Sequence, residues 1–290
     1  MSTHGSPPRF PTILLQFIAT TTTKGNIMKL CLKIGLMIAA LVSPFGIASA
    51  DTTNAYANSG IPLESIDDAP WVATIVMHGT RNQFCGGALV APGWVLTAAH
   101  CVDTPTVRKD PSRIDVVLGT LNYASGGEQI TVSEIFMNPS WNPSTMDFDV
   151  ALLRLSNSAT IGRPIQMYES ENLPGDMTVQ VSVWGSTAQG GPGTPVLKYT
   201  EVPTVSNYTC NAPESYNGAL TNTMFCTGYP RGGKDACPGI SGGPVYVRIW
   251  GEIRLGGIVS WGHGCAVALR FGVNTQVSAI SDWANQTMSN

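Results

Sequence analysis

Charged residues are scarce in this 290-residue chain: Asp, Glu, Lys and Arg make up 12% of it, while hydrophobic residues make up 43%. This balance argues against an intrinsically disordered protein, because such chains combine low hydrophobicity with high net charge. The chain also lacks an uninterrupted apolar run of the roughly 20 residues that a membrane-spanning helix requires. Internal repeats and low-complexity tracts are absent as well. Glycine (31) and proline (20) are abundant, which favours a turn-rich β protein with a large core.

The N-terminal part has the layout of a secretory signal. Residues 28–33 (MKLCLK) are a short basic stretch, an apolar run follows through Val42, and Ala48-Ser49-Ala50 supplies small residues before a cleavage point. We therefore expect residues 1–50 to be a signal or targeting segment that is cut after Ala50. Residues 1–27 stand ahead of this signal. Either Met28 is the true start of the protein, or these residues belong to one unusually long targeting peptide.

Removal of residues 1–50 leaves 240 residues, enough for one all-β domain of two barrels. This part carries all 19 acidic residues but 12 of the 16 basic ones, so its formal charge is −7. Such a charge argues against nucleic acid and anionic membranes as partners. Six cysteines remain, an even number that is expected in an oxidising compartment. We expect a secreted, extracellular protein, with Asn207 and Asn285 as glycosylation candidates in Asn-x-Thr motifs.

Short β-like runs separated by Gly and Pro dominate the chain from residue 70 onward. Residues 51–69 are polar and without periodicity, and we expect a propeptide or a loose N-terminal segment there. Residues 70–290 then form the main domain, with a first barrel over 70–155, a connector over 156–174, and a second barrel from 175. A short helix is predicted at 279–288. The expected strands are 71–77, 86–90, 94–97, 114–118, 130–137, 150–155, 178–184, 197–205, 224–228, 244–248, 253–261 and 271–276.

The most informative stretch is residues 235–244 (DACPGISGGP), which places Ser241 between glycines. Such backbone can present one Oγ and aim neighbouring N–H groups at a single point. A serine oxygen is a poor nucleophile unless a base takes its proton. His100, at the end of an apolar run beside a cysteine, is a candidate base; the alternative is a core histidine bound to a backbone carbonyl. Asp149, leading into a buried-looking strand, is a candidate for orienting that base.

The chain order His100, Asp149, Ser241, with the motifs around these residues and the cysteine positions, resembles the trypsin-like (chymotrypsin-family) serine proteases. The resemblance covers roughly residues 70–288. It implies an all-β fold of two antiparallel Greek-key β-barrels with a short C-terminal helix. It also implies that the active site lies in the crevice between the barrels, with His100 and Asp149 on one wall and Ser241 on the other.

The resemblance assigns a role to each of these residues. His100 is expected to act as general base and then general acid, and Asp149 to orient the imidazole and stabilise its charged form. The backbone N–H groups of Gly239 and Ser241 are expected to form the oxyanion hole. Asp147 is a nearby rival of Asp149, but the family's aspartate leads directly into a Val-Ala-Leu-Leu strand. We therefore expect Asp147 to be a solvated turn residue.

Substrate preference is implied by residues that match the trypsin pocket. Asp235, six residues before Ser241, matches the carboxylate at the pocket floor, and Gly262 and Gly272 match its walls. A carboxylate there favours Arg or Lys at P1 through charge-assisted pairing; the alternative is a loop aspartate beside a disulfide. Ser260 is expected to contact the substrate backbone. His263 is expected at the pocket rim, with no catalytic role.

The resemblance also sets expectations for disulfides, cofactors and partners. Sequence alone permits fifteen pairings of six cysteines. No cofactor and no metal is expected, since the loop that binds calcium in some relatives lacks its matching carboxylate near Thr120. The expected partners are protein or peptide substrates with Arg or Lys at P1 and protein protease inhibitors, and we expect a monomer. The expected disulfides are Cys85–Cys101, Cys210–Cys226 and Cys237–Cys265.

The chain departs from the family in the region linked to activation. Family members are usually cut after a basic residue, and the new Ile-Val-Gly-Gly amino terminus then pairs with an aspartate just before the catalytic serine. In this chain Ile240 occupies the position of that aspartate. Residues at about 61–64 (IPLE) stand where Ile-Val-Gly-Gly is expected, and residues 51–78 contain no Lys or Arg at which an activating cut could be made. Val183 also replaces the usual Gly of a Gly-Trp-Gly segment.

The amino terminus and the aspartate of that ion pair are both missing here. This is physically consistent, because either partner without the other would be a buried unpaired charge. Two interpretations follow. In the first, the oxyanion hole forms without an activating cut, and the protein is a serine endopeptidase that cleaves after Arg or Lys through an acyl-enzyme. In the second, the loop around Gly239 is collapsed, and the protein is an inactive homologue that acts as a binding or decoy protein.

Overall fold

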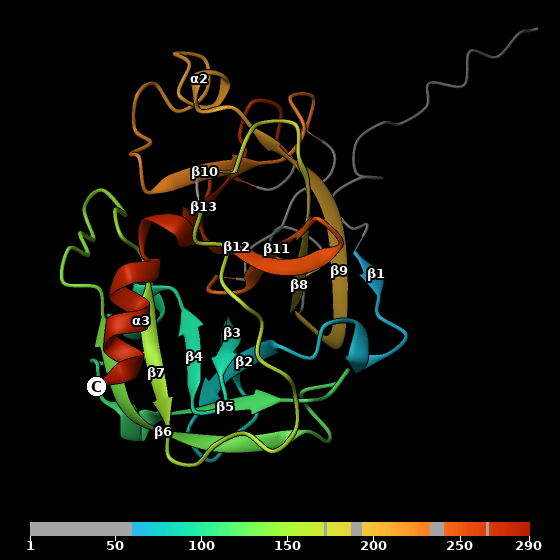
Figure 1. Ribbon diagram of the computed structural model, residues 1–290, viewed down its shortest axis with the longest axis vertical. Helices are drawn as coiled ribbons and strands as arrows, with labels where there is room; N and C mark the ends of the chain where they lie inside the picture. The colour runs from blue at the N-terminus through green and yellow to red at the C-terminus, as the bar shows by residue number, and fades with distance from the viewer. Residues whose placement is uncertain (1–59, 171–172, 187–192, 233–240, 265–266) are drawn as a thin grey trace, which may run out of the picture. The chain divides into compact units, whose positions relative to one another are not determined.

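The computed structural model describes residues 60–170, 173–186, 193–232, 241–264 and 267–290. Figure 1 shows two groups of strands within this part, and each group closes into a barrel. In the first barrel the strands follow the order β2-β3-β4-β7-β6-β5, and β5 pairs with β2 to close it. Its strands are β2 (Val72–Met77), β3 (Gln83–Ala91), β4 (Trp94–Thr97), β5 (Ile114–Leu118), β6 (Glu128–Met137) and β7 (Ala151–Leu155).

The second barrel is built from a seven-stranded sheet in the order β1-β9-β10-β13-β12-β11-β8, closed by pairing of β8 with β9. All the strand pairs in both barrels are antiparallel, so the predicted fold class is confirmed. Its strands are β1 (Ile61–Pro62), β8 (Thr178–Ser186), β9 (Gly193–Val205), β10 (Met224–Thr227), β11 (Pro244–Ile249), β12 (Glu252–Trp261) and β13 (Gly272–Gln276).

Helices are short and lie outside the barrels' strand order. The predicted C-terminal helix is present as α3 (Ser281–Ser289). Within the described residues, no helix combines the length and the apolarity needed to cross a membrane. The other helices are α1 (Ala99–Val102), α2 (Asn207–Cys210) and the 3-10 turns η1 (Ile66–Asp68), η2 (Pro111–Arg113) and η3 (Val277–Ala279).

β-Branched and leucine side chains fill the first barrel. All five residues of β5 (IDVVL) are buried, and its one carboxylate, Asp115, is 3% exposed.

Burial alone raises the pKa of Asp115, but hydrogen bonds from Gly79 N (2.9 Å), His78 Nδ1 (2.9 Å) and Gln129 Nε2 (2.7 Å) outweigh it and lower that pKa. The stabilisation from the ionised carboxylate is therefore present above its unfolded pKa and lost as the pH falls through its folded pKa.

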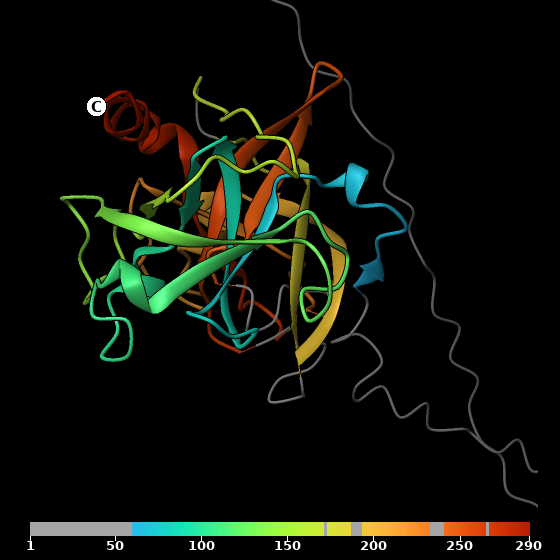
Figure 2. The ribbon, with the colours of Figure 1, turned by 90° about the horizontal axis from the view of Figure 1, so that it is seen from below.

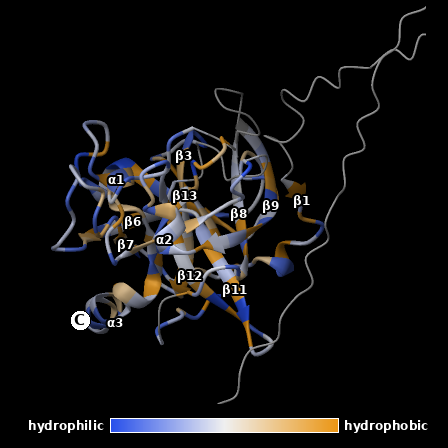
Figure 3. Ribbon diagram, turned by 90° about the horizontal axis from the view of Figure 1, so that it is seen from above, coloured by the Kyte–Doolittle hydropathy of each residue, from blue (hydrophilic) through white to orange (hydrophobic). Residues whose placement is uncertain are grey.

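Residues 60–69 are not the loose segment expected over 51–69, whereas the alternative of a propeptide stays a prediction; residues 51–59 lie outside the described part. Ile61 and Pro62 pair with β9, and Leu63 N donates to Leu197 O at 3.1 Å. Leu63 is 8% exposed, and Ala69 is fully buried. Figures 1 and 2 both place β1 beside β9, and Figure 3 shows apolar colour at β1. This segment is thus part of the second barrel before the chain enters the first.

The connector after the first barrel also pairs with the second. Met167 forms a parallel bridge with Leu255, and backbone hydrogen bonds run from Tyr168 N to Leu255 O and from Leu255 N to Gln166 O, each 2.8 Å long. The first barrel is therefore joined to the second by paired backbone on both its entering and its leaving side.

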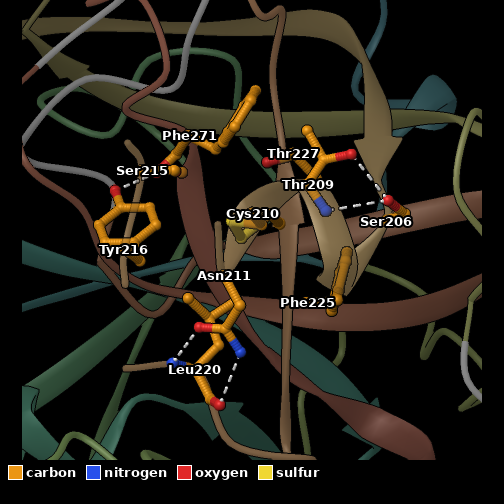
Figure 4. Close-up of a disulfide and its surroundings, with 12 residues drawn as sticks. Ser206, Thr209, Cys210, Asn211, Ser215, Tyr216, Leu220, Phe225, Thr227 and Phe271 are labelled. Atoms are coloured by element: carbon orange, nitrogen blue, oxygen red, sulfur yellow. Dashed lines mark hydrogen bonds between the residues drawn. A yellow bond between two sulfur atoms is a disulfide. The ribbon is translucent and has the colours of Figure 1, made fainter. Parts of the chain in front are cut away.

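Two of the three expected disulfides lie in the described residues, Cys85–Cys101 and Cys210–Cys226, whereas Cys237 and Cys265 lie outside them. Figure 4 shows the surroundings of Cys210, where the Asn211 amide binds both backbone groups of Leu220. Each bridge spans 16 residues, for which the chain-entropy estimate of stabilisation is about 3 kcal/mol.

Replacement of Leu63 by Ala tests the packing of the N-terminal segment. Leu63→Ala should lower the free energy of unfolding by about 2 kcal/mol, because it removes a buried side chain at the edge of the core. Ile61→Ala is the matched control: Ile61 is 55% exposed, so its truncation should have little effect. Urea unfolding of both variants measures the difference. Equal stability of the two would contradict the packing described.

Candidate active site

His100 and Asp149 form a two-point contact. His100 lies in α1, directly after β4, and Asp149 lies two residues before β7. The His100 backbone N donates to Asp149 Oδ1 at 2.9 Å, and its ring Nδ1 lies 2.7 Å from Asp149 Oδ2. A carboxylate only accepts hydrogen bonds, so Nδ1 carries a proton and Nε2 of the neutral ring holds a lone pair. The His100 side chain is 27% exposed, which leaves the ring accessible.

Asp149 is itself held by the second barrel. Its carboxylate is fully buried, and its Oδ2 accepts a hydrogen bond from Ser260 Oγ of β12 at 2.5 Å. Thr275 Oγ1 of β13 donates to the Asp149 backbone carbonyl at 2.8 Å. A buried carboxylate is stable only when its oxygens are hydrogen-bonded, and here both barrels supply the donors. The Ser260 hydroxyl is thus directed at Asp149, and the expected contact of Ser260 with the substrate backbone stays a prediction.

Ser241 lies three residues before β11, with its backbone between the two barrels. Gly86 N of β3 donates to Ser241 O at 2.7 Å, and Gly242 N donates to Val259 O of β12 at 2.7 Å. Cys101 Sγ lies 3.7 Å from Ser241 O and 3.9 Å from His100 Nε2. The structure therefore brings the Ser241 backbone close to the residues that carry the imidazole.

Glycine is required where this backbone meets the first barrel. Gly242 has a φ of +81°, and a Cβ there would lie 2.3 Å from Thr97 Oγ1 and 2.5 Å from Gly86 O. A Cβ on Gly86 would lie 2.9 Å from Gly243 Cα. The backbones of the two barrels thus approach as closely as they do because both surfaces lack side chains.

Of the residues expected to line the substrate pocket, Gly262 and Gly272 are described and lie opposite each other. A Cβ on Gly262 would be 3.8 Å from Gly272 Cα. His263 is exposed, and its ring packs at a tilt against those of Tyr216 and Trp261, with ring centroids 5.3 and 5.7 Å away. Asp235, Gly239 and Ile240 lie outside the described residues, and of Val183 only its place in β8 is described.

Three residues near the site were missed or misjudged in the sequence. Asp147 is not a solvated turn residue: it is half-buried, and its Oδ1 accepts hydrogen bonds from Thr221 Oγ1 (2.7 Å) and Thr223 Oγ1 of the second barrel. Tyr216, whose hydroxyl donates to Phe271 O at 2.5 Å, and Thr275 were not singled out at all. No local motif marks them, because each acts through a partner more than 50 residues away.

Cys85, His100 and Cys101 place possible ligand atoms within 4.8 Å of one another. This group is not suited to hold a metal ion, because a metal requires thiolates and both sulfurs here are consumed in the disulfide.

Comparison with known proteins agrees with this geometry. The chain matches the family Trypsin over residues 60–284. It is 38% identical to trypsin-1 of Salmo salar over 212 residues (71% of this chain and 82% of the relative) and 38% identical to cationic trypsin-3 of Rattus norvegicus over 213 residues (71% and 81%). It is 33% identical to trypsin 5G1 of Aedes aegypti over 225 residues (76% and 81%). The chain belongs to the trypsin-like, chymotrypsin-family serine proteases.

Replacement of Gly86 by Ala tests the close approach of the barrels. The added methyl would meet Gly243 backbone rather than a flexible side chain, so Gly86→Ala should destabilise the protein by about 1–3 kcal/mol. Gly93→Ala is the control, since a Cβ at Gly93 meets nothing within 4 Å. Thermal unfolding measures both variants. A Gly86→Ala protein as stable as Gly93→Ala would contradict the contact.

Proposed function

We propose that this protein is a secreted serine endopeptidase that cleaves peptide bonds after Arg and Lys, with His100, Asp149 and Ser241 as its catalytic residues. The observation that carries the proposal is the buried Asp149 carboxylate, which accepts hydrogen bonds from His100 N, His100 Nδ1 and Ser260 Oγ. A carboxylate so placed fixes the ring and leaves Nε2 available as a base toward the segment that carries Ser241.

The proposed reaction proceeds through an acyl-enzyme. Ser241 Oγ attacks the substrate carbonyl carbon while His100 Nε2 takes the hydroxyl proton, and Asp149 stabilises the resulting imidazolium. The backbone N–H groups of Gly239 and Ser241 donate to the oxyanion of the tetrahedral intermediate. The C–N bond then breaks, and the leaving amine receives the proton from His100. A water molecule, deprotonated by His100, attacks the ester and releases the carboxylic acid and Ser241.

The preference for Arg and Lys rests on Asp235 together with Gly262 and Gly272. Opposed glycines leave room for a long side chain, and the Asp235 carboxylate would pair with its positive charge. The trypsins among the relatives are consistent with this assignment.

The second candidate function is an inactive homologue that binds proteins without cutting them. Ile240 favours it, because the aspartate used by relatives to hold the oxyanion hole open is missing. The two-point contact between His100 and Asp149 favours the enzyme instead. In the uncut chain Ile61 pairs with Tyr199 inside β1 and is 55% exposed, so residue 61 is not a buried chain end there. An apolar Ile240 would then hold the loop by its own burial, without an activating cut.

The remaining proposals concern processing and partners. We assign the protein to the extracellular space, with removal of residues 1–50. Asn207 and Asn285 are exposed and available for glycosylation, and the Asn285 amide donates to Glu169 at 3.0 Å. The protein would act as a monomer on protein or peptide substrates and be inhibited by protein protease inhibitors.

The proposed function is tested by labelling with a fluorophosphonate probe, which reacts only with an activated serine, and by hydrolysis of Arg and Lys peptides. Both signals should appear for the protein starting at Asp51, and Ser241→Ala should abolish labelling and lower kcat by about 10⁴-fold or more. Ser133→Ala, on an exposed part of β6, is the control. Failure of the wild type to label or cleave would favour the inactive homologue.

Replacement of Asp235 by Ser tests the specificity assignment. Asp235→Ser should shift preference from basic to apolar P1 residues and weaken inhibition by benzamidine, because it removes the charge at the pocket floor. Asp282→Ser, on the exposed face of α3, should leave both unchanged. The ratio of kcat/KM for Arg and Phe peptides measures the shift. Equal ratios for wild type and Asp235→Ser would place Asp235 outside the pocket.

A further inference from the structure

The Asp147 carboxylate joins the two barrels. Asp147 belongs to the loop between β6 and β7 of the first barrel. Its Oδ1 accepts hydrogen bonds from Thr221 Oγ1 at 2.7 Å and from Thr223 Oγ1, both in the segment just before β10 of the second barrel. The same Oδ1 accepts from Phe148 N at 3.1 Å. One oxygen thus binds both the second barrel and the backbone that leads to Asp149.

The backbone on both sides of Asp147 is strained. Met146 has a φ of 59° and Phe148 a φ of 51°, in the left-handed region that side chains other than Asn or Asp rarely occupy. Such conformations persist only where the surroundings enforce them, and they gather at functional sites. Here the enforcing contacts are the threonine hydroxyls, a bond from Asn142 N to Asp147 O at 3.0 Å, and packing of Met146 on the second-barrel cluster that contains Tyr216.

The threonines are in turn fixed to the strands that hold Asp149. Gln276 N donates to Thr223 O at 2.8 Å, and Met224 pairs with Thr275, whose hydroxyl donates to Asp149 O. A shift of Asp147 would therefore pass through Phe148 to Asp149, and from Asp149 to the His100 ring bonded to it.

We propose that Asp147 is a positioning residue, whose bonds to Thr221 and Thr223 set the place of the Asp149–His100 pair relative to the second barrel, which carries Ser241. The inference rests on the proposed function, since it is Ser241 that His100 must reach. Catalysis by a fixed base and nucleophile is sensitive to displacements of about 1 Å, which can cost about 100-fold in rate.

The test compares Asp147→Ala, Asp147→Asn and the double variant Thr221→Val/Thr223→Val in the full chain. Asp147→Ala should lower kcat by about 10- to 100-fold with little change in KM, because the substrate pocket is left in place. Asp147→Asn should retain most of kcat, since its amide oxygen still accepts from the threonines. Thr221→Val/Thr223→Val should lower kcat as much as Asp147→Ala does. Adding Asp147→Ala to this double variant should lower kcat no further, as expected for partners in one interaction.

Asp115→Ala is the matched control for a general loss of stability. Asp115 is likewise a hydrogen-bonded carboxylate, but all its side-chain partners lie in the first barrel. It should lower the unfolding temperature and leave kcat unchanged well below that temperature. If Asp147→Ala loses activity only in step with its unfolding temperature, as this control does, or if Asp147→Asn is as impaired as Asp147→Ala, the positioning role is overturned.

A second measurement separates this inference from the proposed function. The Nδ1–H proton of His100, which bonds to Asp149, can be followed by NMR without any substrate. Its resonance should shift or broaden in Asp147→Ala and stay in place in Asp115→Ala. If the resonance changes in Asp147→Ala but not in Asp115→Ala, and the wild type cleaves no peptide, only the enzyme assignment is contradicted. If the resonance is unchanged in Asp147→Ala, the positioning role is contradicted.

Discussion

The rest of the structure depends on the hydrogen bonds that both barrels make to the buried carboxylate of Asp149. Removing an ionised group from water costs several kcal/mol unless hydrogen bonds replace the lost solvent. His100 supplies two of these bonds from the first barrel, and Ser260 supplies one from the second. The charge is therefore fully compensated only when the two barrels are in contact. Folding of the interface and assembly of the site are one event, because each requires the other.

The approach of the barrels depends on what is missing as much as on what is present. Gly86 on β3 and the glycines after Ser241 allow backbone to meet backbone without side chains between them. Hydroxyl groups then make the connections: Ser260 and Thr275 bind Asp149, and Thr221 and Thr223 bind Asp147. Short side chains lose little conformational freedom on binding, so an interface built from them holds its geometry at small entropic cost.

Much of this fold could be predicted from the sequence, because its signals are local. Strands β4 and β5 begin and end at the expected residues, since both are rich in large apolar residues and each has a glycine at one end, Gly93 before β4 and Gly119 after β5. The contact between His100 and Asp149 was expected from motifs on either side of them. The two-residue strand β1 was not predicted, because a pair containing proline has no periodicity to detect. The partners of Asp147 were also missed, since Thr221 and Thr223 look like any polar loop until the chain folds.

The paired backbone before and after the first barrel affects transient opening of the interface between the two barrels. Residues 61–63 are paired with β9 and residues 166–168 with β12, so the chain is attached to the second barrel both before and after the first barrel. If the interface opens for a moment, His100 cannot diffuse away from the Ser241 wall. Its return is an intramolecular encounter at high effective concentration, independent of how dilute the protein is. Even in a very dilute solution, the two halves of the site would therefore re-form after each opening.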